Sequence, residues 1–279
     1  MIKFDDIGYW SELKLDIIKE YATAYSKILS AQCNPSFKHV YIDAFSGSGS
    51  HISKATGEFI SGSPLNALDV YPSFKEYHFI DLNGDKIEFL KNKVGERKEV
   101  FYYTGDCNEL LINSIFTRCK YTDYKRALCL LDPYGLHLNW EVIAKAAEYE
   151  TIEIFINFPT MDMQRNVLWQ PHNLSKVSEK NIKRMNSFWG DSSWRDIAYI
   201  EESTLFGPRE KKAENIKVAQ AFKKRLKEKA GFRYIAEPLP MRNRTGATIY
   251  YLFFAAQKPV AKNIFDEIFN KYKYKGFLK

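Results

Sequence analysis

The segment Asp132-Pro133-Tyr134-Gly135 combines groups that can bind and activate an amine. An aryl amine is a poor nucleophile because its lone pair is delocalised into the ring. The Asp132 carboxylate and the Pro133 carbonyl can accept its two N–H groups and orient the lone pair, while Tyr134 can stack on the ring. The alternative is a plain turn at a strand end, in which proline fixes φ.

A second segment, Asp43-Ala44-Phe45-Ser46-Gly47-Ser48-Gly49, has the spacing of a loop that cradles a nucleotide-like ligand. It follows the strand-like run Val40–Ile42. Gly47 and Gly49 let the backbone adopt positive φ and pass close to a ligand. A glycine turn of this kind is also common without a ligand, so the acids at later strand ends decide the interpretation.

Acidic residues follow the next two strand-like runs. Asp81 ends one of them, where a carboxylate accepts hydrogen bonds from ribose hydroxyls. Asp106 follows the other and can bind an adenine amino group, or cap the next helix. Three acids at successive strand ends predict an adenosine site at one edge of a sheet. The predicted cofactor contacts are Asp43, Phe45, Gly47, Gly49, Asp81, Leu82, Asp106 and Cys107.

The charge of the loop discriminates between adenosine-containing cofactors. A dinucleotide places its pyrophosphate at a helix N-terminus, but Asp43 adds negative charge at that place. The sulfonium cation and amino-acid tail of S-adenosyl-L-methionine suit the loop better. We therefore expect S-adenosyl-L-methionine as the cofactor.

Strand-like and helical segments alternate from the first helix to about residue 159, which predicts βαβ units and a mainly parallel sheet. Strands are expected at Val40–Ile42, Tyr77–Ile80, Val100–Tyr103, Ala127–Leu131 and Ile152–Ile156. Helices are expected at Tyr9–Leu29, Pro64–Tyr71, Asp85–Val94, Asn108–Phe116 and Trp140–Glu148.

The end of the chain departs from this alternation. Phe232–Glu237 and Thr248–Ala256 are strand-like runs joined without a helix, so one strand must run antiparallel to the others. This order resembles the class I methyltransferase sheet, a Rossmann-like sheet of seven mostly parallel strands with the last antiparallel. The predicted fold class is α/β, with a helical insertion after strand 5.

Four segments follow from this organisation. We expect an N-terminal helical segment at 1–37 and a cofactor-binding core at 38–159. A helical insertion at 160–210 is predicted to recognise the substrate, because its tryptophans are interleaved with basic residues. A basic helix from about Lys211 to Lys229 and the closing hairpin occupy 211–279.

Charge is divided unevenly along the chain. Residues 1–160 contain 17 Lys and Arg against 22 Asp and Glu, a net charge of −5, whereas residues 161–279 contain 24 against 12, a net charge of +12. A strongly basic half favours a polyanionic partner, here DNA or RNA, over a merely solvated surface. The predicted substrate-binding residues are Asn157, Arg165, Lys183, Arg184, Arg242 and Arg244.

The composition argues against several other classes of protein. The sequence has no apolar run long enough to span a membrane and no signal-peptide pattern at its start, so we expect a cytoplasmic protein. The four cysteines form no CxxC pair and the five histidines do not cluster, so we expect no metal site. Ser46 and Ser48 lack an evident histidine partner, which disfavours a hydrolase.

The Asp132–Gly135 segment resembles the Asp/Asn-Pro-Pro-Tyr/Phe motif of methyltransferases that act on exocyclic amines of nucleic-acid bases. The second proline is absent, and Asp-Pro-Tyr-Gly is closer to the Asp-Pro-Phe-Gly of tRNA guanine-N2 methyltransferases. The resemblance implies methyl transfer to adenine N6 or guanine N2, with Asp132, Pro133 and Tyr134 as catalytic residues. The base must then leave any duplex to reach them.

Over residues 9–160 the chain is similar to the three-Cys-motif partner protein family. The matching motifs are Tyr9-Trp10-x-x-x-Lys14-Leu15, Asp43-Ala44-Phe45-Ser46-Gly47-Ser48-Gly49, Gly62-Ser63-Pro64-Leu65, Phe79-Ile80-Asp81, Gly105-Asp106-Cys107-Asn108 and Leu131-Asp132-Pro133-Tyr134-Gly135. The resemblance implies a prokaryotic methyltransferase-like protein that can have a three-cysteine, radical-type iron–sulfur protein as a partner. It does not supply an acceptor.

Two alternatives remain open. The first is a non-catalytic adaptor with a methyltransferase fold that binds nucleic acid or a three-Cys-motif partner. The second is a methyltransferase that acts on a protein or a small molecule. The sequence does not determine the oligomeric state.

Overall fold

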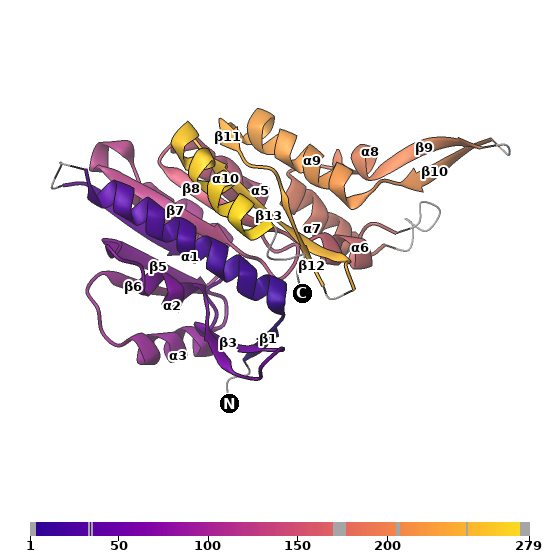
Figure 1. Cartoon of the computed structure of the whole chain (residues 1–279). Coiled ribbons are helices and arrows are strands. Elements are labelled where there is room, and N and C mark those ends of the chain that lie inside the picture. Colours follow the sequence, from indigo (N-terminus) through magenta and orange to yellow (C-terminus); the bar gives the residue numbers. More distant parts are fainter. Residues whose placement is uncertain are drawn as a thin grey trace.

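A computed structural model describes residues 4–32, 34, 36–169, 177–204, 207–243 and 245–273. Its centre is a sheet in which five parallel strands follow the order β6-β5-β2-β7-β8 (Figure 1). Their bounds are Lys38–Asp43 for β2, Glu76–Asp81 for β5, Val100–Thr104 for β6, Lys125–Leu131 for β7 and Ile152–Phe158 for β8. Each strand contains the run that the sequence predicts for it.

The last strand, β13 (Thr248–Ala256), pairs antiparallel with β8. On its other side it pairs antiparallel with β11 (Tyr234–Ile235) and β12 (Leu239–Arg242). Strand β11 lies within the run predicted at Phe232–Glu237, whereas β12 was not predicted and lies in the connection between that run and β13. Pro238 lies between β11 and β12, and β12 itself contains Pro240, which is tolerated because β12 is an edge strand. The predicted α/β class, a mostly parallel sheet with its last strand antiparallel, is confirmed.

Helices cover both faces of the sheet, because alternate side chains of each strand point to opposite sides. Ile42 and Cys129 pack toward α5 (Trp140–Glu148) and α9 (Asn215–Arg225). Tyr41 and Leu128 pack toward the opposite face. That face carries α1 (Tyr9–Ser30), α2 (Ser63–Leu68), α3 (Gly84–Val94) and α10 (Pro259–Lys273). After β6 the chain continues through α4 (Cys107–Leu110), the π-helical turn Leu111–Ile115 and the 3-10 turns Phe116–Arg118 and Tyr121–Asp123.

The two terminal helices lie side by side on the sheet (Figure 1). Helix α1 buries Ile17, Ile18 and Tyr21, in agreement with its predicted apolar stripe. Helix α10 was not predicted. It buries Phe265 against the same face, and its Lys271 Nζ lies 2.8 Å from Glu20 Oε1 of α1.

The insertion after β8 contains helices and also a hairpin. Its helices are α6 (Thr160–Asn166), α7 (Glu179–Trp189) and α8 (Trp194–Ala198). The antiparallel strands β9 (Tyr199–Thr204) and β10 (Gly207–Lys212) then extend away from the body (Figure 1). A wholly helical insertion was expected. The hairpin shows no apolar alternation in the sequence because almost all its side chains are exposed.

The basic helix also begins later than predicted, because the hairpin occupies the residues before it. Helix α9 begins at Asn215 rather than near Lys211, because β10 ends at Lys212. It continues as the π-helical turn Leu226–Ala230. Within the insertion, Trp189 and Trp194 are buried in the core and cannot stack on a ligand at the surface.

A small second sheet joins the start of the chain to the segment after the glycine loop. Strand β1 (Asp5–Ile7) pairs parallel with β3 (Ser50–Ser53), which pairs antiparallel with β4 (Phe59–Ser61). This sheet was not predicted. It brings the Asp5 side chain to the carboxyl edge of the central sheet, where the candidate site lies.

None of the helices in the described part of the chain has the length and apolar character needed to cross a membrane.

Candidate active site

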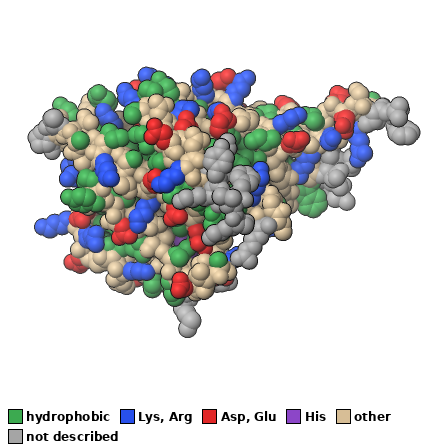
Figure 2. Space-filling model, in the orientation of Figure 1, with side chains coloured by type: hydrophobic (Ala, Val, Ile, Leu, Met, Phe, Trp, Pro, Cys, Tyr) green, Lys and Arg blue, Asp and Glu red, His purple; other side chains and the backbone are tan. Residues whose placement is uncertain are grey.

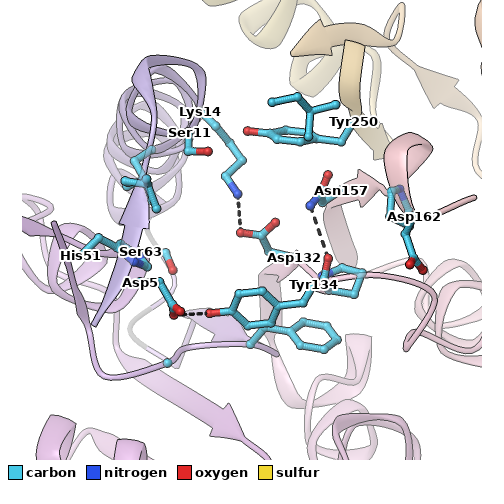
Figure 3. A pocket seen from close by; sticks show the side chains of 17 residues that line it. Asp5, Ser11, Lys14, His51, Ser63, Asp132, Tyr134, Asn157, Asp162 and Tyr250 are labelled. Carbon is cyan, nitrogen blue, oxygen red and sulfur yellow. Dashed lines mark hydrogen bonds and ion pairs between the residues drawn. The ribbon is translucent and has the colours of Figure 1, made fainter. Parts of the chain in front are cut away.

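The carboxyl ends of β2, β7 and β8 border a cavity of about 220 Å³ (Figure 3). The glycine loop after β2 and the Asp132 segment after β7 meet in it, together with the start of α1 and with β13. Its lining consists of Asp5, Ile7, Ser11, Lys14, Leu15, Phe45, Gly47, His51, Ser63, Asp132, Pro133, Tyr134, Asn157, Pro159, Asp162, Ile249 and Tyr250. Two motifs that the sequence predicts separately therefore share one cavity.

Lys14 of α1 forms an ion pair with Asp132 in this cavity, between Nζ and Oδ2 (Figure 3). The Lys14 side chain is only 9% exposed, and that of Asp132 is 24% exposed. Burial lowers the pKa of Lys14, but the charge of Asp132, with smaller contributions from Tyr250 and Asp43, outweighs it and raises the pKa. Lys14 is therefore a buried cation that binds Oδ2 and leaves Oδ1 for another donor.

Asn157, at the end of β8, faces the Asp132 segment. Its Nδ2 donates a hydrogen bond to the Pro133 carbonyl at 3.4 Å (Figure 3). Because a carbonyl can only accept, this contact fixes which end of the amide faces Pro133. The Oδ1 atom of Asn157 is buried and has no hydrogen-bond partner among the described residues. One lone pair of the Pro133 carbonyl is thus engaged, and the Asn157 oxygen adds an acceptor.

Tyr134 is held by two residues on the opposite side of the cavity. Its hydroxyl donates to Asp5 Oδ2 at 2.7 Å, and Lys86 Nζ lies 5.4 Å from its ring centre. Burial, then the hydrogen bond to Asp5, raises the pKa of Tyr134. The residue nevertheless remains 67% exposed, so its ring is accessible to a stacking partner.

Backbone hydrogen bonds attach the glycine loop to neighbouring strand ends. The Ser46 N–H donates to the Ile80 carbonyl at 2.8 Å, and the Gly47 N–H donates to Asp81 Oδ2 at 3.0 Å. Gly47 has a φ of +61°, and the space where a Cβ would stand is open. Gly49 has a φ of +74°, and a Cβ there would lie 2.6 Å from Leu90 Cδ1. The loop needs both glycines, and Gly47 leaves room beside the cavity.

Asp43 lies beneath this loop and is fully buried. The Phe45 N–H donates to Oδ1 at 3.2 Å, whereas Oδ2 has no hydrogen-bond partner among the described residues. Burial raises the pKa of Asp43 to about 7, against the opposing effects of hydrogen bonds with the Ser63 side chain and the Phe45 backbone and of the Lys14 charge. An unpartnered buried carboxylate oxygen favours a nearby cation. The charge of Asp43 therefore fits a ligand that carries positive charge beside the loop.

The other predicted cofactor residues lie along the neighbouring strand ends and not in the cavity lining. Asp81 accepts from both Gly47 and Asn83 backbone N–H groups, which gives it a structural role that the sequence analysis did not assign. Asp106 caps α4 by accepting from the Asn108 N–H at 2.9 Å. Leu82 is 77% exposed, and Cys107 is buried.

The predicted substrate-binding residues are scattered. Arg184 Nη2 pairs with Asp162 Oδ2 at 3.1 Å, beside the cavity. Arg165 and Lys183 are exposed, Arg242 is half-buried at the end of β12, and Arg244 lies outside the described residues. Figure 2 shows Lys and Arg side chains interspersed with Asp and Glu on the face that it presents, with no extended surface of one sign. Among these residues, the structure brings only Asn157 and Arg184 next to the Asp132 segment.

Sequence reasoning missed Lys14, Asp5 and Tyr250 as members of the site. Lys14 carried a signal, because it stands in the buried stripe of α1 between Leu13 and Ile17, where a charged residue is unusual. No sequence pattern indicates Asp5 or Tyr250, since the position of Asp5 depends on the small sheet and that of Tyr250 on the pairing of β13.

No histidine, cysteine or acidic cluster among the described residues could hold a metal ion. The described cysteines, Cys107, Cys119 and Cys129, are free and buried.

Neither a protein-family model nor a curated protein sequence matches the chain. Solved structures do resemble it. Protein LPL1258 from Legionella pneumophila has a TM-score of 0.44 at 12% identity, over 91% of each chain. The methyltransferase domain of bacterial CtHen1-C has a TM-score of 0.41 at 12% identity, over 87% of this chain and 100% of that one. A chain of a fibrillarin/Nop5p complex has a TM-score of 0.43 at 13% identity, over 86% and 83%.

These likenesses are too distant to indicate a substrate, and the fold class rests on the strand order and on the direction of β13. The fold is an α/β fold whose sheet has the strand order and the antiparallel last strand of a class I methyltransferase-like sheet. Membership of the three-Cys-motif partner family finds no support in the comparisons.

Proposed function

We propose that the protein transfers a methyl group from S-adenosyl-L-methionine to an exocyclic amine of a nucleic-acid base, adenine N6 or guanine N2. The observation that carries the proposal is the meeting of two motifs in one cavity: Phe45 and Gly47 of the glycine loop with Asp132 and Tyr134. A cofactor loop and an amine-binding segment must adjoin for direct transfer, since the reacting atoms have to approach to about 3–3.5 Å.

The cofactor, when bound, supplies an electrophilic methyl group on a sulfonium. Asp43 is proposed to attract its positive charge, because Oδ2 is buried without a partner. Gly47 leaves room for the ligand beside the backbone. Asp81 would accept from the ribose hydroxyls, and Asp106 from the adenine amino group. The remaining contacts are assigned to Phe45, Gly49, Leu82 and Cys107.

The acceptor amine is proposed to lie between Asp132 Oδ1 and Asn157 Oδ1. Each oxygen accepts one N–H, and the Pro133 carbonyl provides a further lone pair. Holding both hydrogens orients the nitrogen lone pair at the methyl carbon. The cofactor would supply the methyl carbon: its S–CH3 bond would break as the N–C bond forms, leaving a neutral thioether, and Asp132 Oδ1 would take the proton that the methylated nitrogen loses. Tyr134 stacks on the base, with its ring held by Asp5 and Lys86.

Contacts with the phosphate backbone are assigned to basic residues of the second half of the chain: the exposed Arg165 and Lys183, the half-buried Arg242, and Arg244, which lies outside the described residues. Arg184 belongs to the predicted set but is already paired with Asp162, so it would act on the site's shape rather than on a phosphate. A three-Cys-motif protein as partner, which the family resemblance implies, also belongs to the proposal.

Transfer of a labelled methyl group from S-adenosyl-L-methionine to mixed DNA and RNA tests the function. Nucleoside mass spectrometry would then identify the modified base. We expect incorporation with wild type, and loss of at least about 100-fold with Asp132→Asn, which keeps the shape but removes the charged acceptor. Cofactor affinity should be nearly unchanged in that variant.

Two results would contradict the proposal. Cofactor binding without incorporation into any nucleic acid would favour methylation of a protein or a small molecule. Absence of S-adenosyl-L-methionine binding in calorimetry would favour the alternative of a non-catalytic adaptor that binds nucleic acid or a partner protein.

A further inference from the structure

All three acidic side chains that line the cavity are paired with a cation. Asp132 pairs with Lys14, Asp5 pairs with Lys86 at 3.2 Å, and Asp162 pairs with Arg184 at 3.1 Å. The three cations come from different helices, α1, α3 and α7. The acceptor end of the cavity therefore offers carboxylate oxygens as hydrogen-bond acceptors while its acidic charge is already compensated.

Lys14 is the cation that matters for the amine, because it is bonded to the side chain that would accept the amine proton. It reaches Asp132 from the other end of the sequence, and its ammonium group lies 5.2 Å from the centre of the Tyr250 ring. A lysine this deeply buried keeps its charge mainly because Asp132 balances it. The pair is consequently a fixed part of the cavity, unlike a solvent-exposed ion pair.

A buried cation beside the acceptor oxygen discriminates between two kinds of amine. The exocyclic amine of a base is uncharged at neutral pH and brings only N–H donors. An aliphatic amine such as a lysine side chain has a pKa of about 10.4 and arrives as a cation. Next to Lys14 it meets a like charge at short range, where such repulsion is strong.

We propose that Lys14 determines the substrate class of this site: by neutralising Asp132 it admits an uncharged aryl amine and rejects a protonated aliphatic amine. The inference rests on the proposed function, since it concerns the same acceptor position. The inference distinguishes methylation of a base from methylation of a protein amine. The residue that makes this distinction, Lys14, lies in α1 and outside the Asp132–Gly135 segment.

Ligand binding tests the proposal without requiring turnover. The protein is saturated with S-adenosylhomocysteine, and calorimetry measures the affinities of 9-ethyladenine, 9-ethylguanine and n-butylammonium. Wild type should bind one of the uncharged bases and show no measurable affinity for n-butylammonium. In Lys14→Met, Asp132 is left without its cation, so n-butylammonium should gain at least about tenfold in affinity. It should also displace the base.

Two variants serve as controls. Lys19→Met removes the same charge from the same helix, but Lys19 pairs with Asp69 at 3.2 Å on the surface, so wild-type behaviour is expected. Lys14→Met combined with Asp132→Asn should lose the gained affinity, because the free carboxylate is gone. Lys14→Gln replaces Lys14→Met if thermal melting shows that the methionine variant does not fold.

The proposal is overturned if wild type binds n-butylammonium as well as Lys14→Met does. It is also overturned if the folded variant gains no affinity, or gains it without displacing the base, since the cation would then occupy the space left by Lys14. Failure of wild type to bind S-adenosylhomocysteine would instead contradict the proposed function, so the two failures are distinguishable.

Discussion

Two carboxyl groups of the central sheet, Asp43 at the carboxyl end of β2 and Glu153 near the start of β8, differ in how the fold accommodates them. Burial raises the pKa of each to about 7. Glu153 faces α1, where the Tyr21 hydroxyl donates to its Oε2 at 2.6 Å. Asp43 faces the glycine loop and keeps one oxygen without a partner. Both groups cost stability at neutral pH. Asp43 lies beneath the glycine loop, whose Phe45 and Gly47 line the cavity, whereas Glu153 lies beside α1.

The difference separates an acid with a structural partner from one that we propose binds the charge of a ligand. The surroundings of Glu153 are closed by aromatic side chains, with Tyr21 packed against Phe155 and Phe254. Asp43 instead lies under a loop whose Gly47 lines a cavity. A raised pKa alone would mark the two residues equally, and their partners distinguish them.

The largest effect is expected from Asp43→Asn. Loss of the charge should weaken S-adenosyl-L-methionine binding by about 10- to 100-fold, as expected for a buried interaction with a charged group. Glu153→Gln should leave the affinity unchanged. Calorimetric titration of both variants checks this. Equal losses in the two variants would show that Asp43 has no specific role in cofactor binding.

The affinity for S-adenosyl-L-methionine should depend on pH through the ionisation of Asp43. A cationic ligand prefers the ionised carboxylate, so protonation of Asp43, with its pKa of about 7, competes with binding. Below pH 7 the affinity should fall by up to about tenfold per pH unit. The measurement is titration between pH 5.5 and 8 in parallel with Asp43→Asn, in which this part of the dependence should be absent. An unchanged slope in the variant would assign it to another group.

The free energy of unfolding should depend on pH because Glu153 is buried. Its folded pKa of about 7 lies above the value of 4.5 for the exposed group, so the folded state holds the proton more tightly. The stability that this provides is complete below about pH 4.5 and is lost as pH rises to about 7. Glu153→Gln should therefore be more stable than wild type by about 2 kcal/mol at pH 8, and nearly equal at pH 4.5. Urea unfolding at both pH values measures the difference, and a less stable variant at pH 8 would contradict it.

The smallest effect concerns the donor to Glu153. Tyr21→Phe removes the hydrogen bond to a charged acceptor and should lower stability by about 1–2 kcal/mol at pH 8. At pH 5 the loss should be smaller, because Glu153 is then protonated. The same unfolding experiment applies, with Tyr9→Phe at the start of the same helix for comparison. A loss that does not change with pH would mean that packing, not the charged bond, accounts for it.

Local patterns were sufficient for most of the sheet and insufficient for the site. Ala127–Leu131 and Ile152–Ile156 could be recognised as strands because continuous apolar runs are typical of strands buried on both faces. The meeting of the glycine loop with Asp132 also followed from the sequence, since carboxyl ends of parallel strands share one edge.

Features that depend on contacts between distant segments could not be predicted in this way. The ion pair of Lys14 with Asp132 joins residues 118 positions apart. The small sheet that carries Asp5 is made of strands of three or four residues, too short for periodicity to detect. Asn157 was predicted as a substrate contact. Only the structure shows that its Nδ2 donates to the Pro133 carbonyl and that its Oδ1 has no hydrogen-bond partner among the described residues.

The hydrogen bond from the Gly47 N–H to Asp81 should couple the binding of the two halves of the cofactor, adenosine and methionine. We propose that Asp81 binds the ribose and that the Gly47 loop binds the other end of the cofactor, so the Asp81 carboxylate would contact both parts of the site. A ribose that orders Asp81 also orders the loop, and the tail then binds to a site already formed. Adenosine and methionine, offered as separate fragments, should each bind more tightly in the presence of the other. Calorimetry of each fragment with and without its counterpart would show this mutual gain, and independent binding would show that the two ends are uncoupled.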